Sequence, residues 1–210
     1  MSIKPILFNT DMVRAILDGR KTVTRRKIDI DISNRFDVEI DGTVICYIDQ
    51  ATGDSYKPTD LCRYQPGDIL YVRETWNRNP LNEYGNEPEK YIYKATYDGH
   101  AGEVGWHPSI HMPNEAARIW LKVTNVRVER LHDMPHDAAG KEGIHYCECP
   151  DGFTWKTDTD MNCCYTTPLG AFKTLWNSTI NKEDFNRYGW KANPWVWVME
   201  FERCEKPVAD

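Results

Sequence analysis

The sequence predicts an α+β fold, a small mixed β-barrel with flanking helices and loop insertions. Many short segments rich in β-branched and aromatic residues are separated by turn signals, whereas few segments show helical periodicity. Of the 210 residues, 40% are hydrophobic and 28% are charged, which is the balance of an ordinary globular protein. We therefore expect one domain over residues 1–210, with insertions near residues 29–64, 77–90 and 145–167.

The first predicted elements are a strand, a helix and a second strand. Residues 3–8 form the first strand. Thr10 and Asp11 can cap a short helix that ends at Gly19, because their side-chain oxygens accept hydrogen bonds from free N–H groups. Residues 21–27 leave that helix, and their β-branched side chains suit a strand.

The later elements follow from alternating or helical patterns. Residues 29–32 alternate between acidic and apolar side chains, residues 134–142 form a short helical piece, and residues 169–180 form an amphipathic helix. Residues 77–90 and 145–167 are predicted as loops. Further strands are predicted at residues 43–48, 69–76, 91–95, 118–131 and 195–201, the last with apolar residues on both faces.

Positive charge is concentrated near the N-terminus of an acidic chain. The formal net charge of −6 argues against a generic nucleic-acid coat. Residues 1–30 nevertheless hold seven basic and three acidic side chains, and five of the seven lie within residues 19–27. Such a cluster indicates a focused site for a phosphate, a nucleotide or an RNA backbone. The alternative is a solvated strand edge whose basic side chains block aberrant pairing.

The sequence shows no membrane or secretion signal. No uncharged apolar run approaches the roughly 20 residues needed to cross a bilayer. The first residues lack the apolar stretch and the cleavage site of a secretory signal. The seven cysteines are an odd number, which favours reduced thiols over a disulfide scaffold. We expect a soluble cytoplasmic protein.

Four residues after the first helix carry a family motif. The spacing of Gly19, Lys21, Thr24 and Arg26 resembles the signature of the ASCH family within the PUA-like superfamily. Thr24 stands where many members have glutamate, as in the branch of small bacterial ASCH proteins that hydrolyse N4-acetylcytidine. This resemblance implies that Lys21 and Thr24 are catalytic, together with a glutamate from a later helix. Glu142, which follows a long strand, matches that glutamate by position.

The chain as a whole also resembles longer ASCH-domain proteins of phages and prophages. The supporting segments are residues 66–76, 112–119 and 193–198. This resemblance implies a PUA-like β-barrel and, for a phage-encoded protein, the cytoplasm of a bacterial host. It leaves the activity open, because some ASCH proteins are linked instead to RNA binding or RNA cleavage.

The motif residues suit amide hydrolysis, which needs a nucleophile, a base and a donor for the oxyanion. Thr24 would be the nucleophile and Lys21 its base, in the neutral form that neighbouring arginines favour. Glu142 would handle the hydrolytic water or the substrate amino group. Positions 21 and 24 lie on opposite faces of a regular strand, so a bulge or turn must bring Lys21 to Thr24. No cofactor is expected for this chemistry.

Six further residues are candidate substrate ligands. Arginines can hold phosphate or carbonyl oxygens in a two-pronged fashion, and an aromatic ring can stack on a base. Trp76 is the first candidate for stacking because it ends a strand beside charged residues, and core packing is the alternative. Arg73 and Glu74 could instead pair with neighbours across the sheet. The six candidates are Arg20, Arg25, Arg26, Arg73, Glu74 and Trp76.

Four cysteines raise the question of a structural zinc ion. Cys147, Cys149, Cys163 and Cys164 bracket a loop that has no core of its own. Their spacings are tighter than the separation that structural zinc ligands usually show. Zinc ligation and free thiols in an insertion therefore both stay open.

The sequence is compatible with three functions. The leading prediction is an amidohydrolase that deacetylates N4-acetylcytidine-like nucleosides or RNA. The alternatives are a non-catalytic RNA- or nucleotide-binding phage accessory protein and an ASCH-type ribonuclease. The expected partner is a modified nucleoside or single-stranded RNA, with no membrane involved, and the oligomeric state stays open. The motifs of P-loop proteins, of common serine hydrolases and of zincins do not occur.

Overall fold

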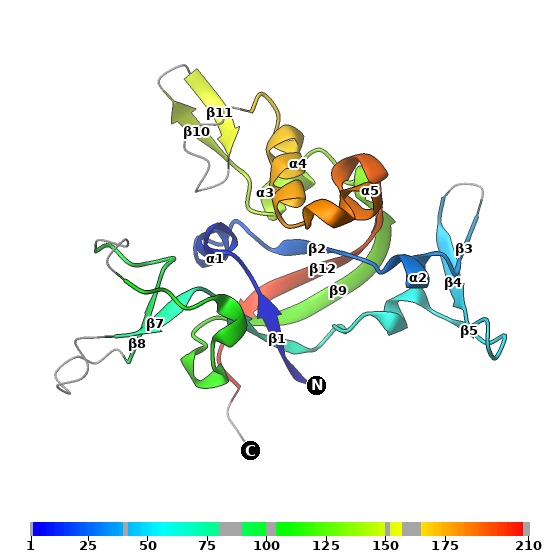
Figure 1. The fold of residues 1–210 in the computed structure, drawn as a ribbon, viewed down its shortest axis with the longest axis horizontal. Helices are drawn as coiled ribbons and strands as arrows, with labels where there is room; N and C mark the ends of the chain where they lie inside the picture. Colours follow the sequence, from blue (N-terminus) through cyan, green and yellow to red (C-terminus); the bar gives the residue numbers. More distant parts are fainter. Residues whose placement is uncertain are drawn as a thin grey trace.

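The computed structural model describes residues 2–39, 42–79, 90–99, 104–149, 152–156 and 165–207. A five-stranded sheet in the order β1–β6–β9–β12–β2 forms its centre (Figure 1). β1 and β6 are parallel, and the other neighbours in the sheet are antiparallel. The strands are β1 (Ile3–Leu7), β2 (Val23–Lys27), β6 (Ile69–Arg73), β9 (Trp120–Arg130) and β12 (Trp195–Cys204).

The mixed α+β class is confirmed, but the described residues form no closed barrel. β1 and β2 are the two edges of the central sheet, and no backbone pairing joins them. One side chain spans these edges, because Arg26 on β2 donates from Nη2 to the carbonyl oxygen of Leu7, the last residue of β1, at 2.6 Å.

β12 separates two apolar clusters, because its side chains alternate between the faces of the sheet. Trp197 and Met199 lie in one cluster, which includes Val13 and Ile16 of helix α1 (Thr10–Leu17). Val196 and Val198 point the other way, into a cluster with apolar residues of helix α4 (Pro168–Ser178): Ala171, Phe172, Leu175 and Trp176. The predicted burial of both faces of this strand is confirmed.

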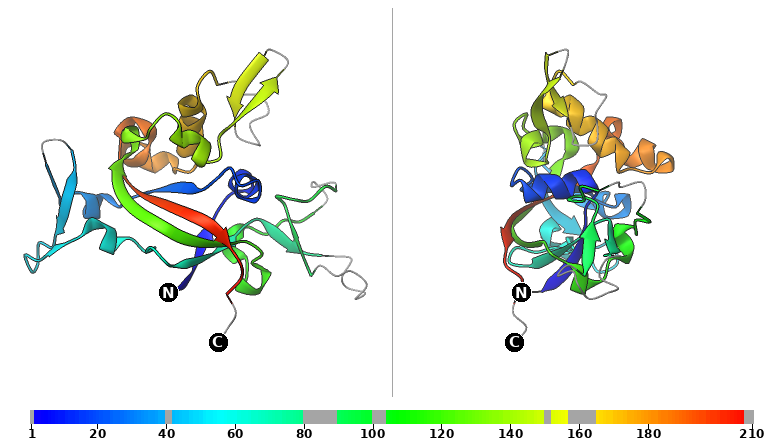
Figure 2. Two further views of the ribbon diagram at one scale, coloured as in Figure 1. Left: turned by 180° about the vertical axis from the view of Figure 1, so that it is seen from behind. Right: turned by 90° about the vertical axis from the view of Figure 1, so that its left-hand side faces the viewer.

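The helices other than α1 gather mainly on one side of the sheet. Figure 2 shows α3 (Ala138–Lys141), α4 and α5 (Phe185–Tyr188) together above β2 and β12. α2 (Ile30–Ser33) follows β2. Short 3-10 helices lie at Pro58–Leu61, Ser109–His111, Asn114–Ala116, Leu131–Asp133, Lys182–Asp184 and Trp190–Ala192.

Three small sheets project from the centre; two lie in the expected insertions at residues 29–64 and 145–167, and the third flanks the expected insertion at residues 77–90. Figure 1 shows the sheet of β3, β4 and β5 opposite the β7–β8 hairpin, with the β10–β11 hairpin beyond α4. Their strands are β3 (Phe36–Val38), β4 (Val44–Ile48), β5 (Ser55–Tyr56), β7 (Trp76–Arg78), β8 (Tyr91–Tyr93), β10 (His145–Cys149) and β11 (Gly152–Lys156).

Several local predictions were wrong. The alternating residues 29–32 had been assigned no element, and they begin the helical turn α2, in which the Asp29 carboxylate accepts from Asp31 N. The residue that caps α1 is Asn9, which accepts from Met12 N. The segment predicted as one strand over residues 69–76 divides into β6 and β7.

The segment 145–167 was wrongly expected to be a loop, because its first part pairs as the β10–β11 hairpin. Residues 157–164 lie outside the described residues. Across the described part of the chain, no helix combines the length and the apolarity that a membrane span requires.

Candidate active site

A turn between α1 and β2 positions Lys21. α1 stops where Gly19 adopts a φ of 72°, and the N–H groups of Arg20 and Lys21 both donate to the carbonyl oxygen of Ala15. Because β2 begins only at Val23, Lys21 precedes the strand and does not follow its alternation. A turn is therefore present at Lys21, and it directs the Lys21 side chain to Glu142 and to the Val23 carbonyl oxygen.

Glu142 reaches the same place from α3. Thr22 N donates to the carbonyl oxygen of Lys141 at 2.9 Å, which ties the end of α3 to the chain just before β2. Gly143 follows with a φ of 104°, and a Cβ atom there would lie 2.8 Å from the Cβ of Ala15. A glycine is thus needed both for the backbone conformation and for the close approach of α3 to α1.

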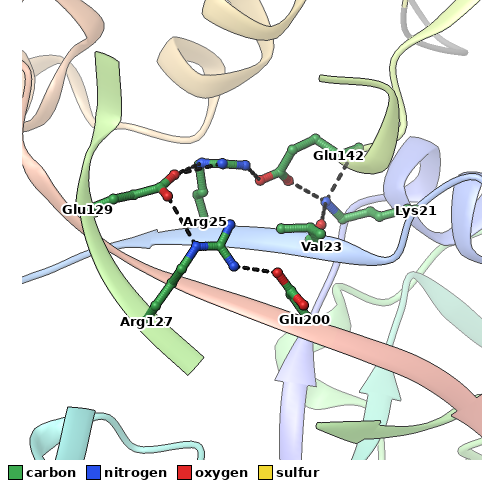
Figure 3. Close-up of polar contacts among 7 residues, drawn as sticks. All are labelled: Lys21, Val23, Arg25, Arg127, Glu129, Glu142 and Glu200. Atoms are coloured by element: carbon green, nitrogen blue, oxygen red, sulfur yellow. Dashed lines mark hydrogen bonds and ion pairs between the residues drawn. The ribbon is translucent and has the colours of Figure 1, made fainter. Parts of the chain in front are cut away.

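Lys21 and Glu142 form a buried ion pair, drawn in Figure 3. Lys21 Nζ donates to Glu142 Oε2 at 2.6 Å, to the Glu142 carbonyl oxygen at 3.0 Å and to the Val23 carbonyl oxygen at 2.8 Å. The side chain of Lys21 is 0% exposed and that of Glu142 is 3% exposed. Burial lowers the pKa of Lys21, and the neighbouring Glu142 carboxylate opposes that shift.

A chain of alternating charges continues from Glu142 toward the surface (Figure 3). Arg25 Nη1 donates to Glu142 Oε1 at 2.9 Å, and its Nε and Nη2 donate to Glu129 Oε1 at 2.8 and 2.6 Å. Arg127 contacts Glu129 Oε2 through Nε at 3.3 Å and also pairs with Glu200. Arg25 is therefore held between two carboxylates, which fixes the orientation of Glu142.

A cavity of about 320 Å³ opens beside this ion-pair chain. Thr24, Arg25 and Glu142 contribute to its wall. Thr24 is 2% exposed, and Thr24 and Glu142 face the same space although 118 positions separate them in the printed sequence. Sequence reasoning missed the rest of the wall, which holds Met12 of α1, Phe172, Leu175 and Trp176 of α4, and Thr179 and Ile180 just after α4.

The only signal for that wall was the apolar face of residues 169–180. This face was predicted as one side of an amphipathic helix, and Phe172, Leu175 and Trp176 do belong to the second apolar cluster. They also line the cavity, because α4 packs beside the edge strand β2 and leaves space there. An apolar wall opposite a few polar groups is typical of small-molecule sites.

Arg26 lies at the cavity without a carboxylate partner. Within the described residues, no acidic side chain comes within ion-pair distance of Arg26. Its Nη2 donates to the Leu7 carbonyl oxygen, and its guanidinium carbon lies 5.3 Å from the centre of the Phe8 ring. Burial lowers the pKa of Arg26, although Tyr64 and Glu142 raise it.

The other candidate ligands lie outside this cavity lining. Arg20 donates to the Gly143 carbonyl oxygen at 2.8 Å and pairs with Asp18. Arg73 donates to the Ile110 carbonyl oxygen. These contacts tie the two arginines to neighbouring loops.

Glu74 and Trp76 are also absent from the lining of the cavity. Glu74 is 1% exposed and forms a two-pronged pair with Arg118 at 2.9 and 3.0 Å. Burial raises the pKa of Glu74, and Arg118 opposes the shift. Trp76 is 8% exposed and packs against Tyr91 and His107, with ring centres 5.5 and 5.3 Å apart. Its position matches the core-packing alternative.

The zinc question is not decided by the described side chains. Cys163 and Cys164 lie outside the described residues, as do the side chains of Cys147 and Cys149. Among the side chains that the structure describes, no group of three or more histidine, cysteine or acidic residues could hold a metal ion.

Comparison of the chain with family models, with curated proteins and with solved structures finds no match. The fold and the cavity define the chain as a mixed α+β protein. It has a buried lysine–glutamate pair beside a ligand-sized cavity.

Proposed function

We propose that the chain is an ASCH-type protein that hydrolyses the N4-acyl amide of an acetylated cytosine. The observation that carries this proposal is that Thr24 and Glu142 line one cavity, while the buried Lys21 donates to the Glu142 carboxylate at 2.6 Å. These are the three residues to which the family resemblance gives catalytic roles. The cavity of about 320 Å³ falls within the range of roughly 300–1,000 Å³ for ligand pockets.

The PUA-like barrel is part of the same proposal. Its support is the contact of Arg26 with Leu7, which links the two edges of the central sheet through a side chain. A barrel of this kind would be completed by side-chain contacts between β1 and β2 in place of a backbone ladder.

The first chemical step must free Lys21, because an ammonium that already donates three hydrogen bonds cannot act as a base. Bound substrate excludes water, and burial favours the neutral forms of both groups. One proton then passes from Lys21 Nζ to Glu142 Oε2, across the 2.6 Å hydrogen bond. This transfer leaves an amine and a carboxylic acid.

The amine then activates Thr24. Lys21 takes the hydroxyl proton as Thr24 Oγ1 attacks the acyl carbon, which forms a tetrahedral oxyanion. The carbon–nitrogen bond breaks as Glu142 protonates the cytosine amino nitrogen, so cytidine leaves and an acyl ester remains on Thr24. Water attacks the ester, Glu142 takes a proton from that water, and Lys21 returns a proton to Thr24 Oγ1 as the carboxylic acid leaves. Proton transfer from Glu142 to Lys21 restores the ion pair.

The test follows cytidine release from N4-acetylcytidine by chromatography. We expect Thr24→Val, which replaces the hydroxyl with a methyl group of similar shape, to lower the rate more than about 100-fold. Thr24→Ser should keep part of the activity because it keeps the hydroxyl. Thr22→Ala is the matched control, because Thr22 is exposed and two positions away. Full activity of Thr24→Val would refute the nucleophile assignment.

A second candidate is a non-catalytic nucleotide-binding protein. It is favoured by the hydrogen bonds of Lys21, whose three N–H groups are all engaged within the protein. On this alternative, the ion pair shapes the cavity and performs no chemistry. Binding of cytidine without hydrolysis of N4-acetylcytidine would select this candidate.

A further inference from the structure

A second cavity adjoins the candidate active site. Its volume is about 310 Å³, and its wall shares Met12, Arg26 and Thr179 with the first cavity. The two cavities are therefore neighbours, and Arg26 lies in the wall of both.

The charge in the lining of the second cavity is positive. Arg26 is the only ionisable side chain among the described residues that line it. The polar groups include the hydroxyls of Thr10, Thr75 and Ser109. Thr75 lies between Glu74 and Trp76, the two neighbours that sequence reasoning selected and that line neither cavity.

The charges of the first cavity, in contrast, are paired. Arg25 and Glu142 belong to the ion-pair chain, and Lys27 contacts Asp184 at 3.2 Å. Among the charged residues of the two linings, Arg26 is therefore the one without an ion-pair partner within the described residues. The half-buried guanidinium of Arg26 has no counter-ion within the described residues, and an anionic ligand group would supply one.

We propose that the second cavity is a phosphate subsite, so that the ligand of the site is a nucleotide or RNA and not a free nucleoside. This inference rests on the proposed function for the identity of the base. A guanidinium offers five N–H donors, and the Leu7 carbonyl oxygen is the one hydrogen-bond acceptor of Arg26 among the described residues. The remaining donors suit the oxygens of a phosphate, which the three hydroxyls can also bind.

Arg26 also donates to the Leu7 carbonyl oxygen, so its substitution removes a structural contact as well as a charge. The control is therefore another arginine that makes the same kind of backbone contact. Arg203 serves this purpose, because its Nη1 also donates to a backbone carbonyl oxygen, that of Leu17, and it lines neither cavity. Ser109→Asp provides an independent variant, since it leaves Arg26 intact and puts a carboxylate at the wall of the second cavity.

The experiment measures the affinities of the full chain for cytidine and for cytidine 5′-monophosphate by titration calorimetry. We expect the wild-type chain to bind the monophosphate at least about tenfold more tightly, as a charge-assisted pair can provide. Arg26→Gln and Ser109→Asp should each abolish this preference, whereas Arg203→Gln should retain it. A dinucleoside monophosphate distinguishes an internal phosphodiester from a terminal phosphate.

Two results would refute the proposal that the second cavity binds phosphate. One is equal affinity of the wild-type chain for all three ligands, or no binding of any of them. The other is a phosphate preference that survives both Arg26→Gln and Ser109→Asp. A phosphate preference without hydrolysis of N4-acetylcytidine would retain the subsite and refute the proposed reaction, and hydrolysis without the preference would do the reverse.

Discussion

Lys21 is a cation that the protein encloses completely. A buried charge is tolerated when each of its donors has a partner, and Lys21 meets this condition with one carboxylate and two backbone carbonyl oxygens. Glu142 likewise contacts a cation at each oxygen, Lys21 at Oε2 and Arg25 at Oε1. The pair is thus a structural unit, whichever chemistry it performs.

Removal of the Glu142 carboxylate should strongly destabilise the fold. We expect Glu142→Ala to lower the free energy of unfolding by about 3–5 kcal/mol, because it leaves the Lys21 charge buried without a counter-ion. Urea denaturation of the wild-type chain and the variant measures this change. The double variant Lys21→Met with Glu142→Met should recover part of the loss, since no unpaired buried lysine remains.

Asp18→Ala is the control for this measurement. It breaks the pair with Arg20, in which the Asp18 side chain is 58% exposed. An ion pair open to solvent contributes about 0–1 kcal/mol, so this variant should unfold close to the wild-type midpoint. Equal effects of Glu142→Ala and Asp18→Ala would contradict the role given to the buried pair.

At the scale of elements, one carboxylate ties β1 to the turn before β6. Asp68 accepts from Ser2 Oγ at 2.7 Å, from Lys4 Nζ at 2.6 Å and from Gln65 N at 2.8 Å. Burial alone would raise the pKa of Asp68, but these hydrogen bonds and the Lys4 charge outweigh it and lower the pKa to about 2. The two parallel strands are therefore joined at their starts by an ionised group.

The free energy of unfolding should therefore decrease in acid, because Asp68 becomes protonated there. A carboxyl group whose pKa is lower in the folded state stabilises that state above its unfolded pKa of about 3.9 and loses this contribution as pH falls toward 2. We expect Asp68→Asn to lower the free energy of unfolding by about 2 kcal/mol at pH 7 and by much less at pH 2.5. Urea midpoints at both pH values measure the difference.

Asp31→Asn is the control for the acid dependence, because Asp31 is an exposed aspartate. It should change the urea midpoint little at either pH. A difference between wild type and Asp68→Asn that stays constant from pH 7 to pH 2.5 would contradict the coupling of Asp68 to folding.

Elements with long local patterns could be predicted from the sequence. The helix at Thr10–Leu17 and the strands at Trp120–Arg130 and Trp195–Cys204 follow the expected ranges closely, because each buries an apolar face over several residues. The turn at Ile30–Ser33 was missed because four residues fit an alternating pattern and a helical one equally well. The β10–β11 hairpin gave no periodic signal at all.

The site was less predictable, because its contacts are not local. Pairing of Lys21 with Glu142 spans 121 positions, and nothing in either segment alone indicates it. The family resemblance selected both residues, but the use of Arg25 to hold Glu142 emerged only from the structure. Thr75 was missed because an uncharged residue between Glu74 and Trp76 has no chemical signal of its own.

At the scale of the molecule, the central sheet should be much more protected than the projecting sheets. β12 pairs with β9 on one side and β2 on the other, and six of its ten residues are buried. The β3–β5 sheet instead leaves Val38, Ile45 and Ile48 at least 40% exposed. Amides in β12 should exchange with solvent on the order of 100-fold more slowly than those of β4.

Hydrogen exchange followed by mass spectrometry can compare these two strands. Peptides that cover β6 and β9 provide an internal reference from the same sheet. Similar exchange in β4 and β12 would show that the projecting sheet unfolds together with the centre, contrary to this expectation.

The pairing of β2 has a consequence for how the protein is made. Among the described strands β2 has one neighbour, β12, and residues 23–27 pair with residues 196–200. A ribosome therefore releases Thr24 long before the strand that holds it in the sheet. β1, β6 and β9 can associate first, whereas the cavity forms only after the final strand has emerged. Until then, residues 23–27 lack the strand that pairs with them.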